Sequence, residues 1–516
     1  MKISGFGRPF GLLPFAFCLL PCFPLSAQNV PVQEVILDNG MKVLLVQRKG
    51  SPNISAGWIA KVGSVNEHPG VTGISHLFEH MMFKGTQTLG TKNIEEDLKL
   101  NQQLDRIKAE LRQEEQALTQ KAREGEIADA KDPKARSSRH QQLLTDFDKL
   151  NARQKDLLVK NEFDKVYTAA GGSGMNAGTS QDFTIYFISV PSNKLELWFW
   201  MESDRLSNPV FREFYSEREV VAEERRMRVE STPTGRYLQQ FDNMFWRSSP
   251  YGWPVIGWPS DLEAITREDA MAYFGQYYAP NNLTACLVGD FEPSQAIALA
   301  KKYFGRLQRS RHETEPVRTA EEPQVGEQRM SASAETNPEV HIRFHTVADG
   351  HKDEPAFIIL GTLLNDRTGR LYKSLVLEQQ VASGAFANHE GRKYEGFFEF
   401  RGVAKAGKTP EQVEQAIYKE IEKLQTTLVP ERELQKVKNQ QAATNFRALQ
   451  SNFSLMQQLL VADINRGWRT INTDPPKLQT VTAEDIRRIA KKYFAPEGRN
   501  VLVLNTKRAA AAGGGR

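Results

Sequence analysis

The chain has 516 residues, of which 40% are hydrophobic and 25% are charged, and its formal net charge is +4. This apolar content is enough to build a buried core, which excludes a wholly disordered chain. Because 67 basic residues are balanced by 63 acidic ones, the composition also argues against a protein whose main partner is nucleic acid.

The N-terminus has the composition of a secretory signal peptide. Lys2 and Arg8 precede an apolar run, and Leu25-Ser26-Ala27 forms a small-residue cleavage site. We therefore expect residues 1–27 to be removed. A membrane anchor is the alternative, but prolines interrupt a run that is already shorter than the ~20 residues a spanning helix needs.

Removal of this segment leaves Cys286 as the one cysteine of the mature chain, so an intramolecular disulfide is excluded. An exported protein without disulfides is typical of a bacterial envelope compartment. We expect a periplasmic protein, with secretion as the alternative. No other segment is long and apolar enough to be a transmembrane anchor.

Two segments of the chain repeat each other. Residues 266–280 read TREDAMAYFGQYYAP, residues 482–496 read TAEDIRRIAKKYFAP, and a short apolar run follows each. Each copy predicts an amphipathic helix, a turn at Ala-Pro and a buried strand. The repeat indicates duplicated domains.

The repeat sets the expected domain boundaries. The sequence predicts a first domain at 28–311, a linker rich in Glu, Pro, Thr and Ser at 312–337, a second domain at 338–506 and a disordered tail at 507–516.

The first domain is longer because of an insertion at about 94–163. Apolar residues recur in it at helical spacing in two runs on either side of Pro133: Leu104, Ile107, Leu111 and Leu118, then Leu143, Phe147, Leu150 and Leu157. This pattern predicts an antiparallel helical hairpin with an apolar seam. A solvated spacer and a surface that grips a partner are equally compatible with it.

A candidate metal site lies in the stretch from Ile74 to Phe83. On a helix, His76, Glu79 and His80 share the face opposite the apolar residues. Two histidines at i and i+4 can bind one zinc ion, and H-x-x-E-H is the inverzincin order. Glu79 is placed to take a proton from zinc-bound water. The alternative is two hydrogen-bonded histidines on a surface helix.

A zinc hydrolase needs a third protein ligand. The stretch 217–226 predicts a helix with Glu217 and Glu224 two turns apart on one face. A solvated helix with salt bridges is the alternative.

The run His76-Leu77-Phe78-Glu79-His80, followed by Met81-Met82-Phe83-Lys84-Gly85-Thr86, resembles the signature of the pitrilysin/insulinase family of zinc peptidases. The similar subgroup has half-length chains, like the mitochondrial processing peptidase and its bacterial relatives. The resemblance covers nearly all of the mature chain except the insertion. It implies an α+β fold of two homologous α/β sandwich-like domains, each a mainly antiparallel sheet covered by helices, of which only the first is catalytic.

The resemblance also implies residue roles. His76, His80 and Glu224 would bind Zn²⁺, with Glu223 as the alternative ligand. Glu79 would be the catalytic base, and Glu217 would support the site by orienting a histidine. The 145-residue separation of Glu79 and Glu224 exceeds the family's usual spacing, and the insertion accounts for the difference.

The stretch 174–180 resembles the family's edge strand, along which an extended substrate pairs by backbone hydrogen bonds. Asn176 and Ala177 are assigned to substrate contact on that resemblance alone. The local sequence by itself favours an ordinary strand after a Gly-rich turn.

The second domain lacks an H-x-x-E-H motif, and Lys438 stands where the repeat aligns with Glu224. Family members also use an Arg and a Tyr, seven residues apart, from the opposing half of the enclosure. No such pair occurs between Gly361 and Arg401.

We therefore expect a zinc endopeptidase that hydrolyses peptides or unfolded segments together with a homologous chain carrying the missing pair. A homodimer is the alternative assembly. A non-catalytic subunit, or a binding or scaffold protein of the same fold, is the alternative function.

Overall fold

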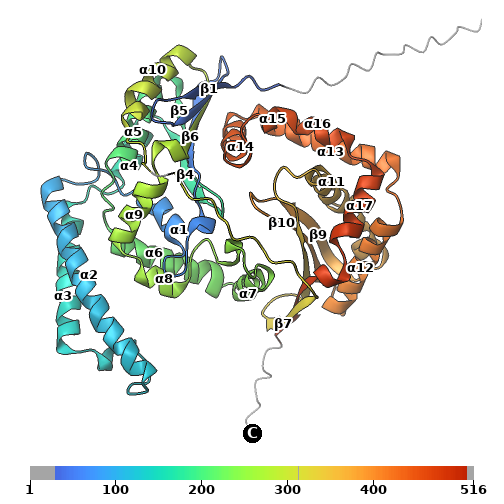
Figure 1. The fold of residues 1–516 in the computed structure, drawn as a ribbon, viewed down its shortest axis with the longest axis horizontal. Coiled ribbons are helices and arrows are strands. Elements are labelled where there is room, and N and C mark those ends of the chain that lie inside the picture. Colours follow the sequence, from blue (N-terminus) through green and yellow to red (C-terminus); the bar gives the residue numbers. More distant parts are fainter. Residues whose placement is uncertain (1–28, 312, 508–516) are drawn as a thin grey trace, which may run out of the picture.

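The structure is a computed structural model that describes residues 29–311 and 313–507. The expected signal peptide at 1–27 and all but the first residue of the expected tail lie outside these residues. The chain forms two lobes, each built on one β-sheet with helices packed against it (Figure 1). Among the described residues, no helix combines the length and apolar character needed to cross a bilayer.

The first half of the chain builds a six-stranded sheet. Its strands, in spatial order, are β1 (Gln33–Ile36), β2 (Lys42–Gln47), β6 (Leu283–Gly289), β3 (Asn53–Ala60), β5 (Thr184–Pro191) and β4 (Ser173–Thr179). Neighbouring strands are antiparallel except for the parallel pair β2 and β6. Because β4 ends the sheet, one side of its backbone has no neighbouring strand among the described residues.

The second half builds a five-stranded sheet with a similar plan. Its strands, in spatial order, are β7 (Gln328–Ala334), β11 (Asn500–Thr506), β8 (Glu339–Thr346), β10 (Gly396–Ala404) and β9 (Ala382–Glu390). The only parallel pair in it is β7 and β11. The predicted α+β class, with two similar mainly antiparallel sheets covered by helices, is confirmed.

Strand β7 corrects one predicted boundary, because it lies inside the segment 312–337 that the sequence assigns to a linker. Its sequence, QRMSASA, contains only one large apolar residue, Met330, and its side chains alternate between half-buried and exposed up to the buried Ala334. The strand is held by its backbone pairing with β11. Composition therefore could not distinguish this edge strand from the polar segment before it.

The described part of the first half contains ten α-helices: α1 (Ile74–Met81), α2 (Ile94–Arg123), α3 (Ser138–Leu157), α4 (Glu162–Ala169), α5 (Leu195–Ser207), α6 (Phe214–Arg225), α7 (Gly235–Phe245), α8 (Pro259–Ala264), α9 (Arg267–Tyr277) and α10 (Pro293–Tyr303). The described part of the second half contains α11 (Glu354–Leu364), α12 (Pro410–Thr426), α13 (Glu431–Gln450), α14 (Asn452–Asn465), α15 (Thr470–Thr473), α16 (Pro475–Thr480) and α17 (Ala483–Tyr493).

The two repeated segments adopt the same local structure. Helices α9 and α17 each begin with a capping box, formed by Thr266 with Asp269 and by Thr482 with Asp485. Each helix is followed by a proline turn and then by an interior strand of its sheet, β6 or β11. The same start, stop and strand signals thus produce the same unit twice.

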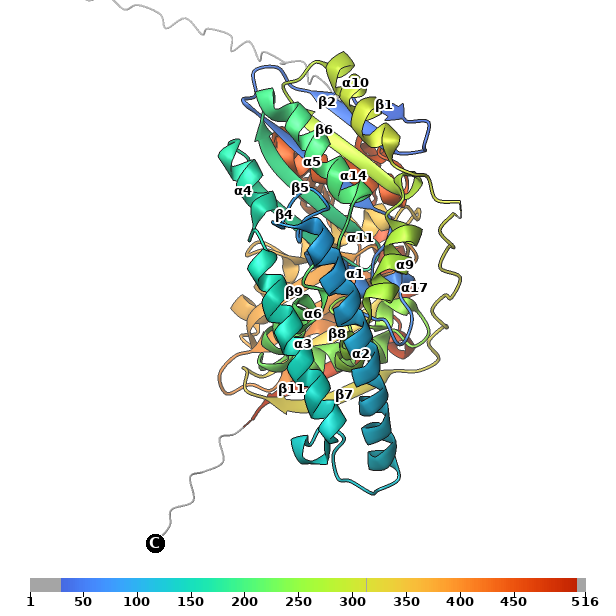
Figure 2. The ribbon, with the colours of Figure 1, turned by 90° about the vertical axis from the view of Figure 1, so that its left-hand side faces the viewer.

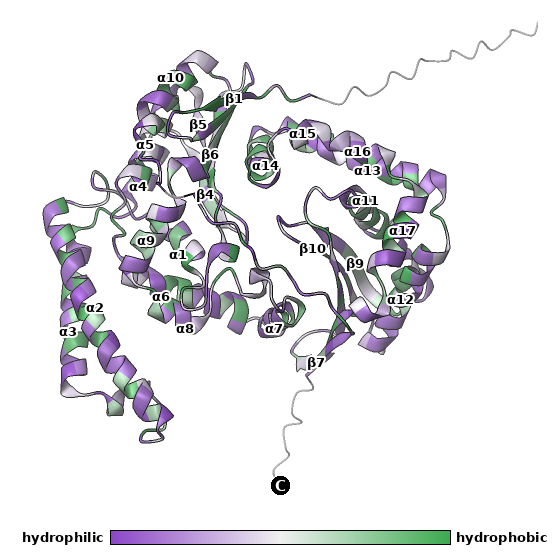
Figure 3. Cartoon of the chain, in the orientation of Figure 1, coloured by the Kyte–Doolittle hydropathy of each residue, from purple (hydrophilic) through white to green (hydrophobic). Residues whose placement is uncertain are grey.

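One helix from each half also packs against the sheet of the other half. Helix α14 packs Leu455, Met456 and Leu459 against a face of the first sheet that includes Leu44 and Cys286. Figure 1 shows α14 beside that sheet, and Figure 3 shows its largely hydrophobic surface.

In the reciprocal contact, Phe241 of α7 packs against Leu502 and Leu504 of β11. The ring of Phe245, also in α7, stacks on His345 of β8 with ring centroids 3.9 Å apart. The two sheets are therefore joined by exchanged helices as well as by the linker.

The insertion contains α2 and α3, which lie side by side and project beyond the rest of their lobe (Figures 1 and 2). Their facing sides bury Leu104, Leu111, Leu118, Leu143 and Phe147. Hydrophilic residues cover most of both helices (Figure 3).

The base of this hairpin is fixed by a buried ion pair between Asp97 of α2 and Arg212. Arg212 Nη1 donates to the carbonyls of Lys84 and Leu89, each at 3.0 Å, and its Nη2 donates to that of Thr86 at 2.7 Å. Both Asp97 and Arg212 are buried. The hairpin is thereby tied to the loop that leaves α1.

Candidate active site

Helix α1 presents the H-x-x-E-H motif. The side chains of Ile74, Leu77, Phe78 and Met81 are buried, as the predicted apolar face requires. Gly73 precedes the helix with φ of 90°, and a Cβ at this position would lie 2.7 Å from the carbonyl oxygen of Ile256. Glycine is therefore required for the chain to enter the helix here.

A buried carboxylate holds the start of α1. The two oxygens of Glu67 accept hydrogen bonds from the backbone N–H groups of Gly73 and Ser75, both at 2.8 Å. These N–H groups have no partner within the helix, so the carboxylate satisfies them. Burial raises the pKa of Glu67 to about 7, even though both hydrogen bonds favour the ionised form.

His76, His80 and Glu224 converge on one point. Glu224 Oε2 lies 3.7 Å from His76 Nε2 and 3.3 Å from His80 Nε2, and the three ligand atoms all lie within 4.8 Å of one another. Two ligand atoms of a tetrahedral zinc ion are roughly 3.3 Å apart, given Zn–N and Zn–O bonds near 2.0 Å. No other such cluster of metal-ligating side chains occurs in the residues that the structure describes. The donor set therefore fits zinc.

The structure separates Glu224 from the alternative ligand Glu223. The Glu224 side chain is 15% exposed, and its Oε1 is 2.7 Å from Nη2 of Arg228. The Glu223 side chain is 51% exposed and pairs with Arg226. Only Glu224 joins the histidine pair.

Glu217 lies behind His80 and fixes the orientation of its ring. His80 Nδ1 lies 2.9 Å from Glu217 Oε1, to which it donates, and Lys84 Nζ lies 2.5 Å from Glu217 Oε2. With the Nδ1 proton held by Glu217, the lone pair of His80 Nε2 points toward Glu224. Burial opposes the charge on Glu217, but its bonds to His80 and Lys84 outweigh this effect and lower its pKa.

The two histidines differ in their electrostatic surroundings. Burial, with the nearby His80 and Arg228, lowers the pKa of His76 to about 3, so its imidazole is neutral and able to donate a lone pair. Burial also lowers the pKa of His80, but Glu217, Glu224 and Glu79 raise it more, and the net shift is upward.

Glu79 lies on the same helix face but is not part of the ligand cluster. Its Oε2 accepts a hydrogen bond of 2.7 Å from the hydroxyl of Thr179, at the end of β4. Burial raises the pKa of Glu79. Sequence reasoning did not single out Thr179. The one feature that could have indicated a role for it is its position in the segment assigned to the substrate strand.

The residues proposed for substrate contact lie on β4, at the edge of the first sheet. Ala177 lines the same cavity as the histidines, whereas the side chain of Asn176 is exposed and its Oδ1 accepts from the N–H of Ala177 at 2.9 Å. Their role in substrate binding stays a prediction.

The cluster opens into a cavity of about 740 Å³. Its walls come from α1, β4, the end of α6, the π-helical segment Arg226–Glu230, α7 and residues 251–256. Trp246, Trp253 and Arg392 also line it. Sequence reasoning did not single out these three residues, because they are distant from the motif in the chain.

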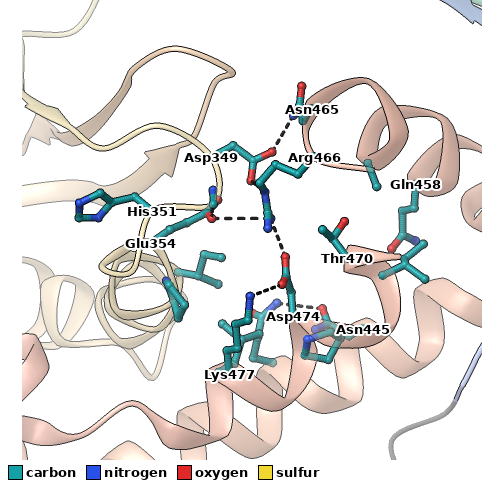
Figure 4. A pocket seen from close by; sticks show the side chains of 18 of the residues that line it. Asp349, His351, Glu354, Asn445, Gln458, Asn465, Arg466, Thr470, Asp474 and Lys477 are labelled. Atoms are coloured by element: carbon teal, nitrogen blue, oxygen red, sulfur yellow. Dashed lines mark hydrogen bonds and ion pairs between the residues drawn. The ribbon is translucent and has the colours of Figure 1, made fainter. Parts of the chain in front are cut away.

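A larger cavity of about 990 Å³ lies elsewhere, between β5 and helices of the second half. Several of its charged groups pair with one another: Arg466 bonds to Asp349 and Asp474, and Lys477 also bonds to Asp474 (Figure 4). It holds none of the predicted site residues, so the smaller cavity is the candidate active site.

Two family models match the chain. Residues 42–154 match "Insulinase (Peptidase family M16)", and residues 264–441 match "Peptidase M16 inactive domain". The first matched range contains the H-x-x-E-H motif and the second begins before β6 and ends within α13.

Curated relatives and solved structures agree with these models. The chain is 27% identical to the zinc protease PqqE of Helicobacter pylori, over 96% of this chain and 97% of that protein. It is 22% identical to the probable mitochondrial-processing peptidase subunit beta of Arabidopsis thaliana, over 63% of each.

A protease structure from Helicobacter pylori matches with a TM-score of 0.74 and 24% identity, over 92% of this chain and 99% of that one. The periplasmic protease PqqL of Escherichia coli matches with a TM-score of 0.67 and 16% identity, over 92% of this chain but 48% of that one. These structures share the fold of this chain. The two family models and the match to PqqE over nearly the whole of both chains show that the chain is a half-length member of the pitrilysin/insulinase peptidase family, M16.

Proposed function

We propose that the protein is a zinc-dependent endopeptidase that hydrolyses peptides or unfolded segments. The observation that carries this proposal is the convergence of His76, His80 and Glu224 on one point, with Glu79 beside them. The names of the curated relatives, several of them zinc proteases, support it.

The chemistry follows from the donor set. Zinc held by His76, His80 and Glu224 would lower the pKa of a bound water and polarise the scissile carbonyl. Glu79 is the proton carrier: it accepts the proton of the attacking water and returns it to the leaving amine.

The neighbouring residues keep these groups in place. Glu217 fixes the His80 ring so that Nε2 faces the metal position, and Lys84 holds Glu217 from the other side. Thr179 fixes one oxygen of Glu79. The unpaired edge of β4, with Asn176 and Ala177, would bind the extended substrate by backbone hydrogen bonds.

We expect zinc retention to distinguish Glu224 from its neighbour Glu223. The Glu224→Ala variant should lose most of its zinc, because it removes one of three ligands. The Glu223→Ala variant should keep it, since this side chain points to solvent. Metal content after dialysis, measured by atomic emission, tests this directly. Equal zinc in the two variants would count against the assigned ligand set.

The complete enzyme is proposed to contain a second, homologous chain that supplies the Arg/Tyr pair. The match to about half of the PqqL chain supports pairing of half-length units. In this chain the region from Leu371 to Gly384 forms the π-helical segment Tyr372–Glu378 and the start of β9. PqqL of Escherichia coli is a periplasmic protease, and this location supports the proposal that the present chain is exported to the periplasm.

Peptide cleavage by the chain purified alone, compared with the assembly co-purified from its native host, tests the need for a partner. We expect the assembly to have the higher kcat, because only it would hold the complete set of residues around the scissile bond. Equal rates per zinc site would favour the homodimer or a self-sufficient chain. Hydrolysis by neither preparation, with zinc bound, would favour the non-catalytic subunit.

A further inference from the structure

One residue of the second half lines the cavity of about 740 Å³ that opens beside the predicted zinc ligands, called the zinc cavity below. Arg392 lies in the turn between β9 and β10, yet its side chain lines the cavity that also contains His76, Glu79 and Glu224. None of the residues assigned to the proposed chemistry comes from this half of the chain.

The turn that carries Arg392 is fixed to the first half by hydrogen bonds. The backbone N–H of Lys393 donates to Asp182 Oδ2 at 3.3 Å, and that of Tyr394 donates to the hydroxyl of Tyr251 at 3.2 Å. The Tyr251 hydroxyl in turn donates to Asp182 Oδ1 at 2.8 Å. The position of Arg392 is therefore set by the contact between the two halves.

The guanidinium of Arg392 lies among aromatic rings. It is 4.9 Å from the ring centroid of Tyr251, 5.3 Å from that of Phe397 and 5.7 Å from that of Trp246. Its Nε donates to Glu390 Oε1 at 2.7 Å, and Nη2 lies 2.5 Å from the same oxygen. Cation–π contacts and this ion pair together hold the group in one orientation.

One nitrogen of the Arg392 guanidinium has no hydrogen-bond acceptor among the described residues. Arg392 Nη1 is buried and has no hydrogen-bond partner among the described residues, and the side chain as a whole is 12% exposed. A buried charged donor without an acceptor is costly. The other arginine of the cavity, Arg228, is already paired with Glu224. Arg392 is thus a preformed donor that lacks an acceptor.

We propose that Arg392 binds a carboxylate of the peptide in the zinc cavity and so gives the site a preference for acidic substrates. This inference rests on the proposed peptidase function. A carboxylate is favoured over a neutral carbonyl because its full negative charge adds Coulombic attraction to the hydrogen bond from the guanidinium. The carboxylate is either the C-terminus of a short peptide or an acidic side chain near the cleaved bond.

Peptide binding tests this proposal without relying on turnover. We would measure fluorescence anisotropy of labelled peptides on the zinc-loaded E79Q protein. One pair of peptides differs only in a C-terminal carboxylate or amide, and a second, amidated series differs only in Glu or Gln at successive positions. The protein should bind the carboxylate member of at least one pair about tenfold more tightly. The pair that shows the preference identifies the source of the carboxylate.

Adding Arg392→Gln should abolish that preference, whereas adding Lys393→Gln should keep it. Lys393 is the matched control, because it carries the same charge in the same turn but does not line the cavity. Equal binding of carboxylate and neutral peptides by the protein with Arg392 would overturn the proposal, as would an equal effect of both substitutions. Separately, hydrolysis of the neutral peptides by the enzyme with Glu79 tests the peptidase function itself.

Discussion

Replacing Glu79 by Gln should reduce kcat by about 10²–10⁴-fold while zinc stays bound, because the change removes a proton carrier and no metal ligand. The amide keeps the size of the side chain and can still accept the hydrogen bond from Thr179. Steady-state cleavage of a fluorogenic peptide, alongside the zinc content of the same sample, measures both quantities.

His76→Ala is the matched control, since it removes a ligand from the same helix and should lose zinc and turnover together. Thr179→Val should retain zinc and lose less activity than Glu79→Gln, because it frees the base without removing it. Full activity in Glu79→Gln would refute the assigned base.

The largest loss of stability is expected from Arg212→Met. This change leaves the buried Asp97 carboxylate without its charged partner, although Gln154 still donates to it. It also removes the guanidinium donor from the carbonyls of Lys84, Thr86 and Leu89, of which Leu89 keeps the backbone N–H of Thr86. Removing one partner of a buried ion pair costs about 3–5 kcal/mol. Urea unfolding followed by circular dichroism would measure this as a lower free energy of unfolding.

The same hairpin offers an exposed pair for comparison. Arg153 of α3, with a side chain 64% exposed, pairs with Glu96 of α2, the neighbour of Asp97. Arg153→Met should cost less than about 1 kcal/mol, because water already screens the exposed pair. Asp97→Leu combined with Arg212→Met should recover part of the loss, since no buried charge then remains. Equal effects of the two single substitutions would mean that the buried pair does not anchor the hairpin.

The parts of the fold that sequence reasoning predicted well are those with a local, periodic signal. The apolar face of α1, the repeated unit at α9 and α17, and the two runs of leucines in α2 and α3 are all read within one helix length. The third ligand position, Glu224, was harder, because its partner histidines lie more than 140 residues earlier. Only the resemblance of the surrounding helix to a known family connected them.

The residues that were missed act across long separations in the chain. Arg212 stabilises carbonyls near position 86, and Arg392 reaches a cavity built around position 76. A single arginine produces no periodic pattern in the sequence. Its partners here are backbone carbonyls or aromatic rings, which occur throughout any sequence and therefore do not indicate the contact. Such contacts are determined by how the two sheets pack, and one sequence does not show that packing.

Helices α7 and α14 each cover the sheet of the opposite lobe. If the chain were cut in the segment between the lobes, each fragment would lose the helix that covers its own sheet. Each would also keep a helix whose apolar face no longer has a sheet to pack against. Although the two halves contain the same repeated unit, we do not expect either half to fold independently of the other. This exchange of helices constrains how the two repeats can diverge in sequence. A substitution on the covered face of one sheet must remain compatible with the packing of a helix from the other repeat.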